Sequence, residues 1–180
     1  ENARAEGFDL PIVYNTSGYE NVESLKMLEG IVDIYLPDFK YMDSTLAKKY
    51  SKAVDYPAVA KKAVAEMVRQ QPDAVFDGQT GLIMKGVIVR QLLLPGHVKD
   101  AKDILKFLYE SYGNHIYISM MSQFTPFGLE EYPEINRRVT KREYERYIDY
   151  AIALGVENAF IQEGDVAEES FIPDFDCEGV

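Results

Sequence analysis

Residues 87–96 read Val-Ile-Val-Arg-Gln-Leu-Leu-Leu-Pro-Gly, and this stretch decides the fold. Val87–Leu94 is almost wholly apolar, and the Pro95-Gly96 pair ends it. A helical pattern over Lys99–Tyr112 follows, and Gly113 stops it. A short, continuous apolar strand of this kind is typical of a parallel sheet that is covered on both faces. The stretch therefore predicts one strand-and-helix unit of an α/β protein.

The same alternation of apolar runs and helical patterns extends outward along the chain. The other predicted strands are Ile12–Tyr14, Ile31–Leu36, Ile116–Met121 and Ala159–Gln162. The other predicted helices are Glu20–Glu29, Thr45–Tyr50, Pro57–Gln70 and a helix that starts at the capping-box sequence Thr140–Glu143. Gln71–Lys85 predicts a loop or a small hairpin. Five strands are fewer than the eight of a closed barrel, so the parallel sheet is either open or part of a barrel.

Length and composition limit the classes of function. The 180 residues favour one domain, here residues 1–163, which an acidic tail of residues 164–180 follows. The net charge of −11 argues against nucleic acid or an anionic membrane as a partner. No apolar run approaches the ~18 residues of a membrane span, and no targeting signal is visible, so we expect a cytoplasmic protein. The one cysteine, Cys177, excludes an intrachain disulfide and a multi-cysteine metal site.

The start of the chain indicates a longer parent protein. Residue 1 is glutamate rather than methionine, and Glu1–Glu6 has the composition of the end of a helix, which Gly7 would stop. A predicted strand follows almost at once. We therefore expect a chain truncated at its N-terminus, with a tag remnant as the alternative.

Polar side chains collect where the predicted strands end, which is where parallel α/β folds carry their active residues. Asn15 and Thr16 follow the first strand, and Asp38 and Lys40 follow the second and share one face if the strand direction continues. Arg90 lies inside an apolar strand and needs a carboxylate, from Asp38 or from a ligand.

Each of these residues also has a purely structural interpretation. The Asn15-Thr16 turn can be an ordinary helix cap, and Asp38 and Lys40 can be a structural ion pair. Gln123, after the strand Ile116–Met121, can present its amide to the same cavity or lie in a surface loop. Lys40 could instead form a Schiff base. His97 and His115 lack the spacing of a zinc site.

Several long strings resemble one protein family, the radical S-adenosylmethionine proteins of the pyruvate formate-lyase-activating-enzyme type, in a largely uncharacterised branch. The strings that carry this resemblance over nearly the whole chain are residues 10–19, 32–42, 90–96, 121–126, 133–138 and 170–175.

The resemblance implies a fold, a cofactor and an activity. The fold would be a partial (β/α) barrel with a [4Fe–4S] cluster that reduces S-adenosylmethionine to methionine and a 5′-deoxyadenosyl radical. That radical abstracts hydrogen, from a glycine of a glycyl radical enzyme in the activating enzymes. The family's Cys-x₃-Cys-x₂-Cys motif does not occur in this sequence. The resemblance therefore implies the later part of the barrel, inactive alone and with no cofactor stably bound, within an oxidoreductase parent.

The resemblance also implies a cofactor-binding set. Asn15 and Thr16 match the family's Asp-Thr-Asn-Gly turn, with Asn15 in place of the aspartate. Asp38 and Lys40 match its Asp-Leu-Lys element, and Arg90 matches the arginine before Val-Pro-Gly. Gln123 falls near a position where the activating enzymes carry a histidine. A zwitterionic methionyl group needs an anion and cations around it, which this set supplies.

The sequence leaves two alternative functions open, and it also predicts self-association. A Schiff-base aldolase would use Lys40, and a non-catalytic binding module would keep the scaffold without the chemistry. The open sheet edge at Ile12–Tyr14 is expected to favour self-association.

Overall fold

The computed structural model describes residue 4 and residues 6–161 of the chain. Its elements are, in chain order, β1 (Val13–Thr16), α2 (Val22–Lys26), β2 (Ile34–Pro37), α3 (Ser44–Ser51), α4 (Tyr56–Gln70), β3 (Val75–Phe76), β4 (Ile83–Leu92), α5 (Val98–Tyr112), β5 (Tyr117–Met121), α6 (Lys141–Leu154) and β6 (Ala159–Ile161). The predicted α/β class is confirmed. Most of the predicted helix end at Glu1–Glu6 and the whole acidic tail of residues 164–180 lie outside the described residues, as does Gln162 at the end of the last predicted strand.

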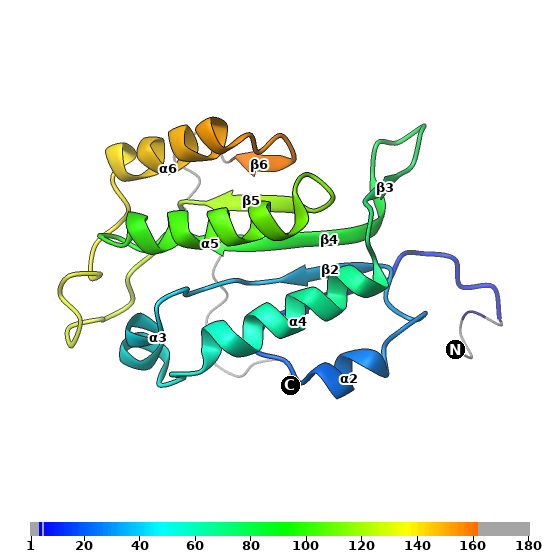
Figure 1. Cartoon of the computed structure of the whole chain (residues 1–180), viewed down its shortest axis with the longest axis horizontal. Helices are drawn as coiled ribbons and strands as arrows, with labels where there is room; N and C mark the ends of the chain where they lie inside the picture. The colour runs from blue at the N-terminus through cyan, green and yellow to red at the C-terminus, as the bar shows by residue number, and fades with distance from the viewer. Residues whose placement is uncertain (1–3, 5, 162–180) are drawn as a thin grey trace.

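The sheet has parallel strands in the order β1-β2-β4-β5-β6, and β3 adds to β4 in antiparallel fashion. This arrangement agrees with a partial (β/α) barrel. β3 and the start of β4 therefore form a hairpin. Of the loop and the small hairpin predicted for Gln71–Lys85, the hairpin is the one that forms. It also explains why β4 begins at Ile83 rather than at the predicted Val87, because Val75 pairs with Lys85 and Phe76 with Ile83. The hairpin projects beyond the parallel strands at the right of Figure 1.

The helices of the described chain lie along one face of the sheet. In Figure 1, α4 and α5 run across the near side of the strands. Val87 and Val89 of β4 face these helices and are fully buried, whereas Ile88 and Arg90 alternate to the other face and are only half-buried. The apolar run of β4 therefore does not reflect two helix-covered faces, as the sequence suggested. Leu92 and Leu94 line a pocket instead.

Capping side chains fix where three of the helices begin. Asn21 and Asp43 accept hydrogen bonds from the backbone N–H groups two residues on, at the starts of α2 and α3. Thr140 and Glu143 form the predicted capping box of α6. The helix predicted over Glu20–Glu29 is shorter than expected. None of the helices that the structure describes is long and apolar enough to cross a membrane.

Two buried tyrosines pack into the core between sheet and helices in opposite chemical situations. Tyr147 of α6 is fully buried, and its hydroxyl has no hydrogen-bond partner among the described residues. Burial raises the pKa of Tyr147. Tyr56 at the start of α4 is 3% exposed, and its hydroxyl contacts three backbone groups. A buried hydroxyl without a partner costs free energy, while a satisfied one contributes to stability.

These two tyrosines give a matched pair of substitutions. Tyr56→Phe is expected to lower the free energy of unfolding by about 1–3 kcal/mol, because it leaves buried backbone groups unpaired. Tyr147→Phe is expected to leave it unchanged or raise it by up to about 3 kcal/mol, because it removes an unpaired hydroxyl. Urea unfolding followed by circular dichroism measures both. A loss above 1 kcal/mol in Tyr147→Phe would show that its hydroxyl does have a partner.

Candidate functional site

The carboxyl ends of β1, β2 and β4 are joined beyond the regular strands. The backbone N–H of Asp38 donates to the carbonyl of Thr16 over 2.9 Å, and that of Phe39 donates to the carbonyl of Arg90 over 2.8 Å. Asp38 and Arg90 thereby sit side by side as a parallel bridge. The chain after β2 thus continues as a strand, as the sequence analysis required for Asp38 and Lys40 to share a face.

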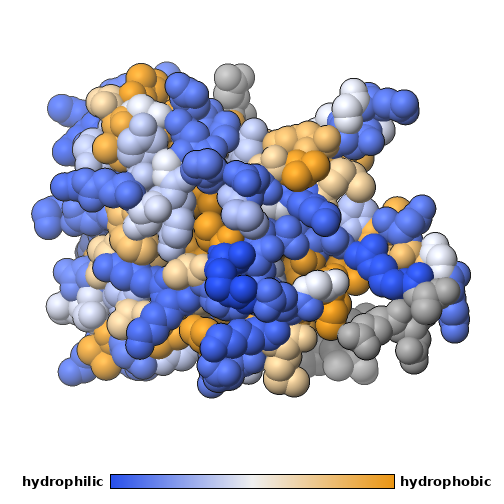
Figure 2. Space-filling model, turned by 45° about the vertical axis from the view of Figure 1, so that its right-hand side comes forward, coloured by the Kyte–Doolittle hydropathy of each residue, from blue (hydrophilic) through white to orange (hydrophobic). Residues whose placement is uncertain are grey.

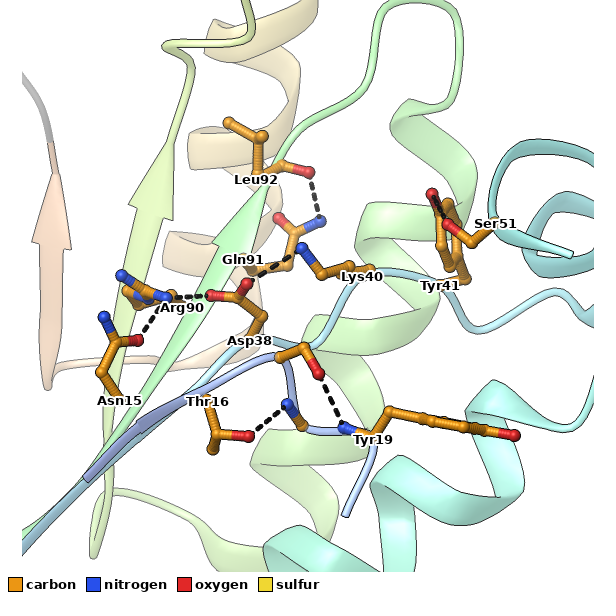
Figure 3. A network of polar contacts seen from close by, with 12 residues as sticks. Asn15, Thr16, Tyr19, Asp38, Lys40, Tyr41, Ser51, Arg90, Gln91 and Leu92 are labelled. Carbon is orange, nitrogen blue, oxygen red and sulfur yellow. Dashed lines mark hydrogen bonds and ion pairs between the residues drawn. The ribbon is translucent and has the colours of Figure 1, made fainter. Parts of the chain in front are cut away.

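A charged cluster occupies this end of the sheet, on the face opposite the helices. Asp38 is its centre: one carboxylate oxygen lies 2.7 Å from a terminal nitrogen of Arg90, and the other lies 3.0 Å from the Lys40 ammonium. Arg90 also donates to the side-chain oxygen of Asn15 over 2.7 Å. Figure 3 shows the three strands presenting these side chains toward one another. Of the two carboxylate sources expected for Arg90, Asp38 or a ligand, the structure shows Asp38.

A pocket of about 310 Å³ lies over the cluster. It combines the three charged side chains with an aromatic and aliphatic wall, and its lining residues are Asp38, Lys40, Tyr41, Arg90, Leu92, Leu94, Met121 and Phe124. The Nε atom of Arg90 is buried and has no hydrogen-bond partner in the described structure. A concave, largely apolar site with a few convergent polar groups has the composition of a small-molecule site.

The hydroxyl of Tyr56 holds the backbone beneath the charged cluster. It donates to the carbonyls of Ser17 (2.9 Å) and Asp38 (3.1 Å) and accepts from the N–H of Lys40 (2.9 Å). Burial raises the pKa of Tyr56. Gly18 allows the close approach: its φ is +74°, and a Cβ there would lie 2.1 Å from the Asp38 carbonyl oxygen.

The glutamate Glu143 fixes the end of the long loop that supplies Phe124. Its carboxylate binds Arg137 through two bonds of 2.7 and 2.8 Å and accepts from the backbone N–H of Gly96 over 2.7 Å. The same carboxylate accepts from the backbone and hydroxyl of Thr140. The Arg137 guanidinium holds the pKa of Glu143 well below its usual range. One side chain thus joins the pocket-side turn, the loop and α6.

The histidine His97 belongs to a second polar group beside the pocket wall. Its Nε2 lies 2.9 Å from the hydroxyl of Tyr50, which donates to Glu134 over 2.8 Å. Glu134 also pairs with Lys49 at 2.5 Å. Burial lowers the pKa of His97, against opposing contributions from Asp100 and Glu134. This group fastens the middle of the loop to α3.

The structure brings four of the six predicted site residues together: Asn15, Asp38, Lys40 and Arg90. Thr16 is 8% exposed, and its hydroxyl bonds to Glu20 on the helix side of the sheet, so it does not line the pocket. Gln123 is half-buried, and its neighbour Phe124 lines the pocket instead.

Sequence reasoning missed three residues of the site: Tyr41, Tyr56 and Phe124. Tyr41 follows Asp38 by three positions, so its place on the strand end was available as a signal. Tyr56 and Phe124 come from a helix start and a loop, where no periodicity shows which way a side chain points.

The donor set does not fit an iron–sulfur cluster. Within the described ranges, no three His, Cys, Asp or Glu side chains are grouped to hold a metal ion. Cys177, the one cysteine of the sequence, lies outside those ranges and could supply a single thiolate. The charged cluster of Asp38, Lys40 and Arg90 does fit an organic zwitterion.

Comparison with known proteins gives one similar protein of unstated function. No family model matches the chain. Over 147 residues the chain is 30% identical to the uncharacterized protein MJ0674 of Methanocaldococcus jannaschii. The match covers 79% of this chain and 38% of that protein, so the chain spans well under half the length of the protein it resembles.

A double-mutant cycle measures the central ion pair. We expect Asp38→Ala and Arg90→Ala to show a coupling energy of about 0.5–3 kcal/mol, because the two groups are in contact and only 22% and 27% exposed. Lys99 and Asp103, 3.5 Å apart on the surface of α5, give the matched control, with coupling close to zero. Unfolding free energies of the single and double variants supply both numbers. Equal coupling in the two cycles would contradict the central role of the pair.

The lowered pKa of His97 predicts a pH dependence of stability. The folded state favours the neutral imidazole ring of His97. The contribution of this residue to the free energy of unfolding is therefore complete above the unfolded pKa of 6.5 and is lost as the pH falls below it. The stability advantage of the wild type over His97→Asn should therefore shrink on acidification. Thermal melts of the wild type and of His97→Asn from pH 8 to pH 5 test this. A pH-independent difference would contradict it.

Proposed function

We propose that this chain forms the part of a radical S-adenosylmethionine protein, of the pyruvate formate-lyase-activating-enzyme type, that binds the methionyl group of S-adenosylmethionine. The observation that carries the proposal is the convergence of Asp38, Lys40 and Arg90 at one end of the parallel sheet, within a pocket. An amino-acid zwitterion needs a carboxylate for its ammonium and cations for its carboxylate. These three side chains supply both.

Each charged group has a distinct role in this proposal. Arg90 and Lys40 would bind the ligand carboxylate, and Asp38 would accept from the ligand ammonium while it still contacts Arg90. The Arg90 side chain is 27% exposed, so part of its guanidinium is accessible to a ligand in the pocket. Asn15 orients the guanidinium from the neighbouring strand.

The apolar wall completes the proposed binding site. Leu92, Leu94 and Met121 offer contacts suited to the thioether-like chain of a methionyl group. S-adenosylmethionine would supply the group that abstracts hydrogen, from a substrate such as the glycine of a glycyl radical enzyme. The cluster's cysteine ligands are not in this sequence, so no step of that chemistry is assigned to these residues. We place the parent protein in the cytoplasm, also as a proposal.

Two other functions are alternatives, a Schiff-base aldolase and a non-catalytic binding module. The site fits the aldolase less well and supports the binding module in one respect. A Schiff-base lysine acts as a desolvated neutral amine, whereas Lys40 is 43% exposed and paired with Asp38. A non-catalytic binding module is favoured by one observation, the replacement of the family's aspartate by Asn15, which pairs with Arg90. Such a module would bind the same zwitterion without the chemistry.

Ligand binding tests the proposal directly. Saturation-transfer NMR should show weak, fast-exchanging binding of S-adenosylmethionine that free methionine displaces. Asp38→Asn and Arg90→Gln should each weaken it by about tenfold or more, because each removes a charge-assisted contact. Asp103→Asn and Lys99→Gln, on the exposed side of α5, are matched controls and should bind as the wild type does. Displacement by methylthioadenosine but not by methionine would contradict a methionyl site.

Cluster assembly gives a second test. Anaerobic reconstitution of this chain with iron and sulfide should yield no stoichiometric [4Fe–4S] signal in electron paramagnetic resonance, since three thiolates are needed and one is present. A full cluster signal from this chain alone would overturn the assignment of the cluster to another part of the parent protein.

A further inference from the structure

Three aromatic rings form an exposed row on the sheet face that the helices leave uncovered. Phe76 of β3 lies edge-on to Tyr117 of β5, with ring centroids 5.3 Å apart. Tyr117 stacks on Phe160 of β6, also at 5.3 Å. We call these three residues the aromatic row. Phe76 is 40% exposed and Phe160 is 46% exposed, although both are large and apolar.

The register of the strands places Tyr117 and Phe160 on the same face as the charged cluster, and Phe76 joins them through its ring contact with Tyr117. Ser119 pairs with both Arg90 and Phe160, so the three positions are level across the sheet. Tyr117 is two residues before Ser119 and therefore points to the same side. Figure 2 shows hydrophobic surface at the base of the hairpin that carries Phe76. A contiguous exposed apolar patch commonly marks a surface at which something binds.

The length and position of the remaining chain indicate which segment this is. Residues 162–180 continue directly from Ile161, the last residue of β6 and the neighbour of Phe160. They carry seven acidic residues and no lysine or arginine, and their aromatic residues fall in one short sequence, Phe171-Ile172-Pro173-Asp174-Phe175. Burying these apolar side chains against a surface would be favourable.

The chain between Ile161 and Phe171 is long enough for the segment Phe171–Phe175 to contact the aromatic row. Phe171 is ten residues beyond Ile161, and ten extended residues span roughly 33–36 Å. The nearest ring of the row, that of Phe160, is on the residue next to Ile161, and the strand of Tyr117 is only about 4.8 Å from β6. A short tether also gives the segment a high effective concentration at the row, which favours it over a separate molecule.

We propose that the segment Phe171–Phe175 folds back on the aromatic row of Phe76, Tyr117 and Phe160 and covers it. The proposal is independent of the function proposed above, because the row lies outside the pocket lining.

The sequence contains no tryptophan, so a single introduced tryptophan reports its own surroundings. In Phe175→Trp, we expect fluorescence emission shifted to the blue and reduced quenching by acrylamide, relative to Glu178→Trp three residues further on. Adding Phe160→Ser or Phe76→Ser to Phe175→Trp should shift the emission back to the red. Phe127→Ser, a 58% exposed phenylalanine outside the row, should leave it unchanged.

Three outcomes would overturn the proposal. The first is red emission from Phe175→Trp that equals that of Glu178→Trp. The second is a blue shift that Phe160→Ser and Phe76→Ser do not reverse, in variants whose circular dichroism shows an intact fold. The third is a blue shift that grows with protein concentration alongside a dimer in light scattering, which would make a second copy the occupant.

Discussion

An arginine inside the central strand of the sheet is the constraint on which the site depends. Arg90 interrupts the apolar run of β4, and a guanidinium there is tolerated because the Asp38 carboxylate lies 2.7 Å away. That contact requires β2 to continue past Pro37 as a strand, which the backbone bonds to Thr16 and Arg90 secure. The ion pair and the strand extension therefore support each other. The pocket forms over the pair because the helices occupy the opposite face of the sheet.

Local signals in the sequence predicted the fold class and the four residues that meet at the charged cluster, Asn15, Asp38, Lys40 and Arg90. The side chains of Asp43 and Thr140 determine helix starts through contacts within a few residues, so their sequences are sufficient to place them. Asp38, Lys40 and Arg90 were identified because strand alternation and the cost of an unpaired charge are both legible in the sequence. The hairpin remained ambiguous, since the two residues of β3 are too few to show a period.

The parts that sequence reasoning missed depend on contacts between distant segments. Thr16 was expected beside the ligand, but it precedes the turn by one position and alternates to the helix side, where it meets Glu20. The hydroxyl of Tyr56 bonds to backbone groups 16 to 39 positions away in the sequence, and the residues next to Tyr56 do not predict these contacts. The sequence also did not predict that the helices leave one face of the sheet uncovered, because a strand that faces a pocket is as apolar as one that faces a helix.

The carboxylate of Glu143 has a mechanical consequence for the pocket. It caps α6, holds Arg137 at the end of the loop and binds the Gly96 turn beside the pocket. Withdrawing that end of the loop would therefore deprive the helix of its cap and the turn of its anchor in the same event. Thermal fluctuations that displace only the loop are penalised by all these contacts together. This end of the loop consequently behaves as a rigid boundary beside the turn at Gly96.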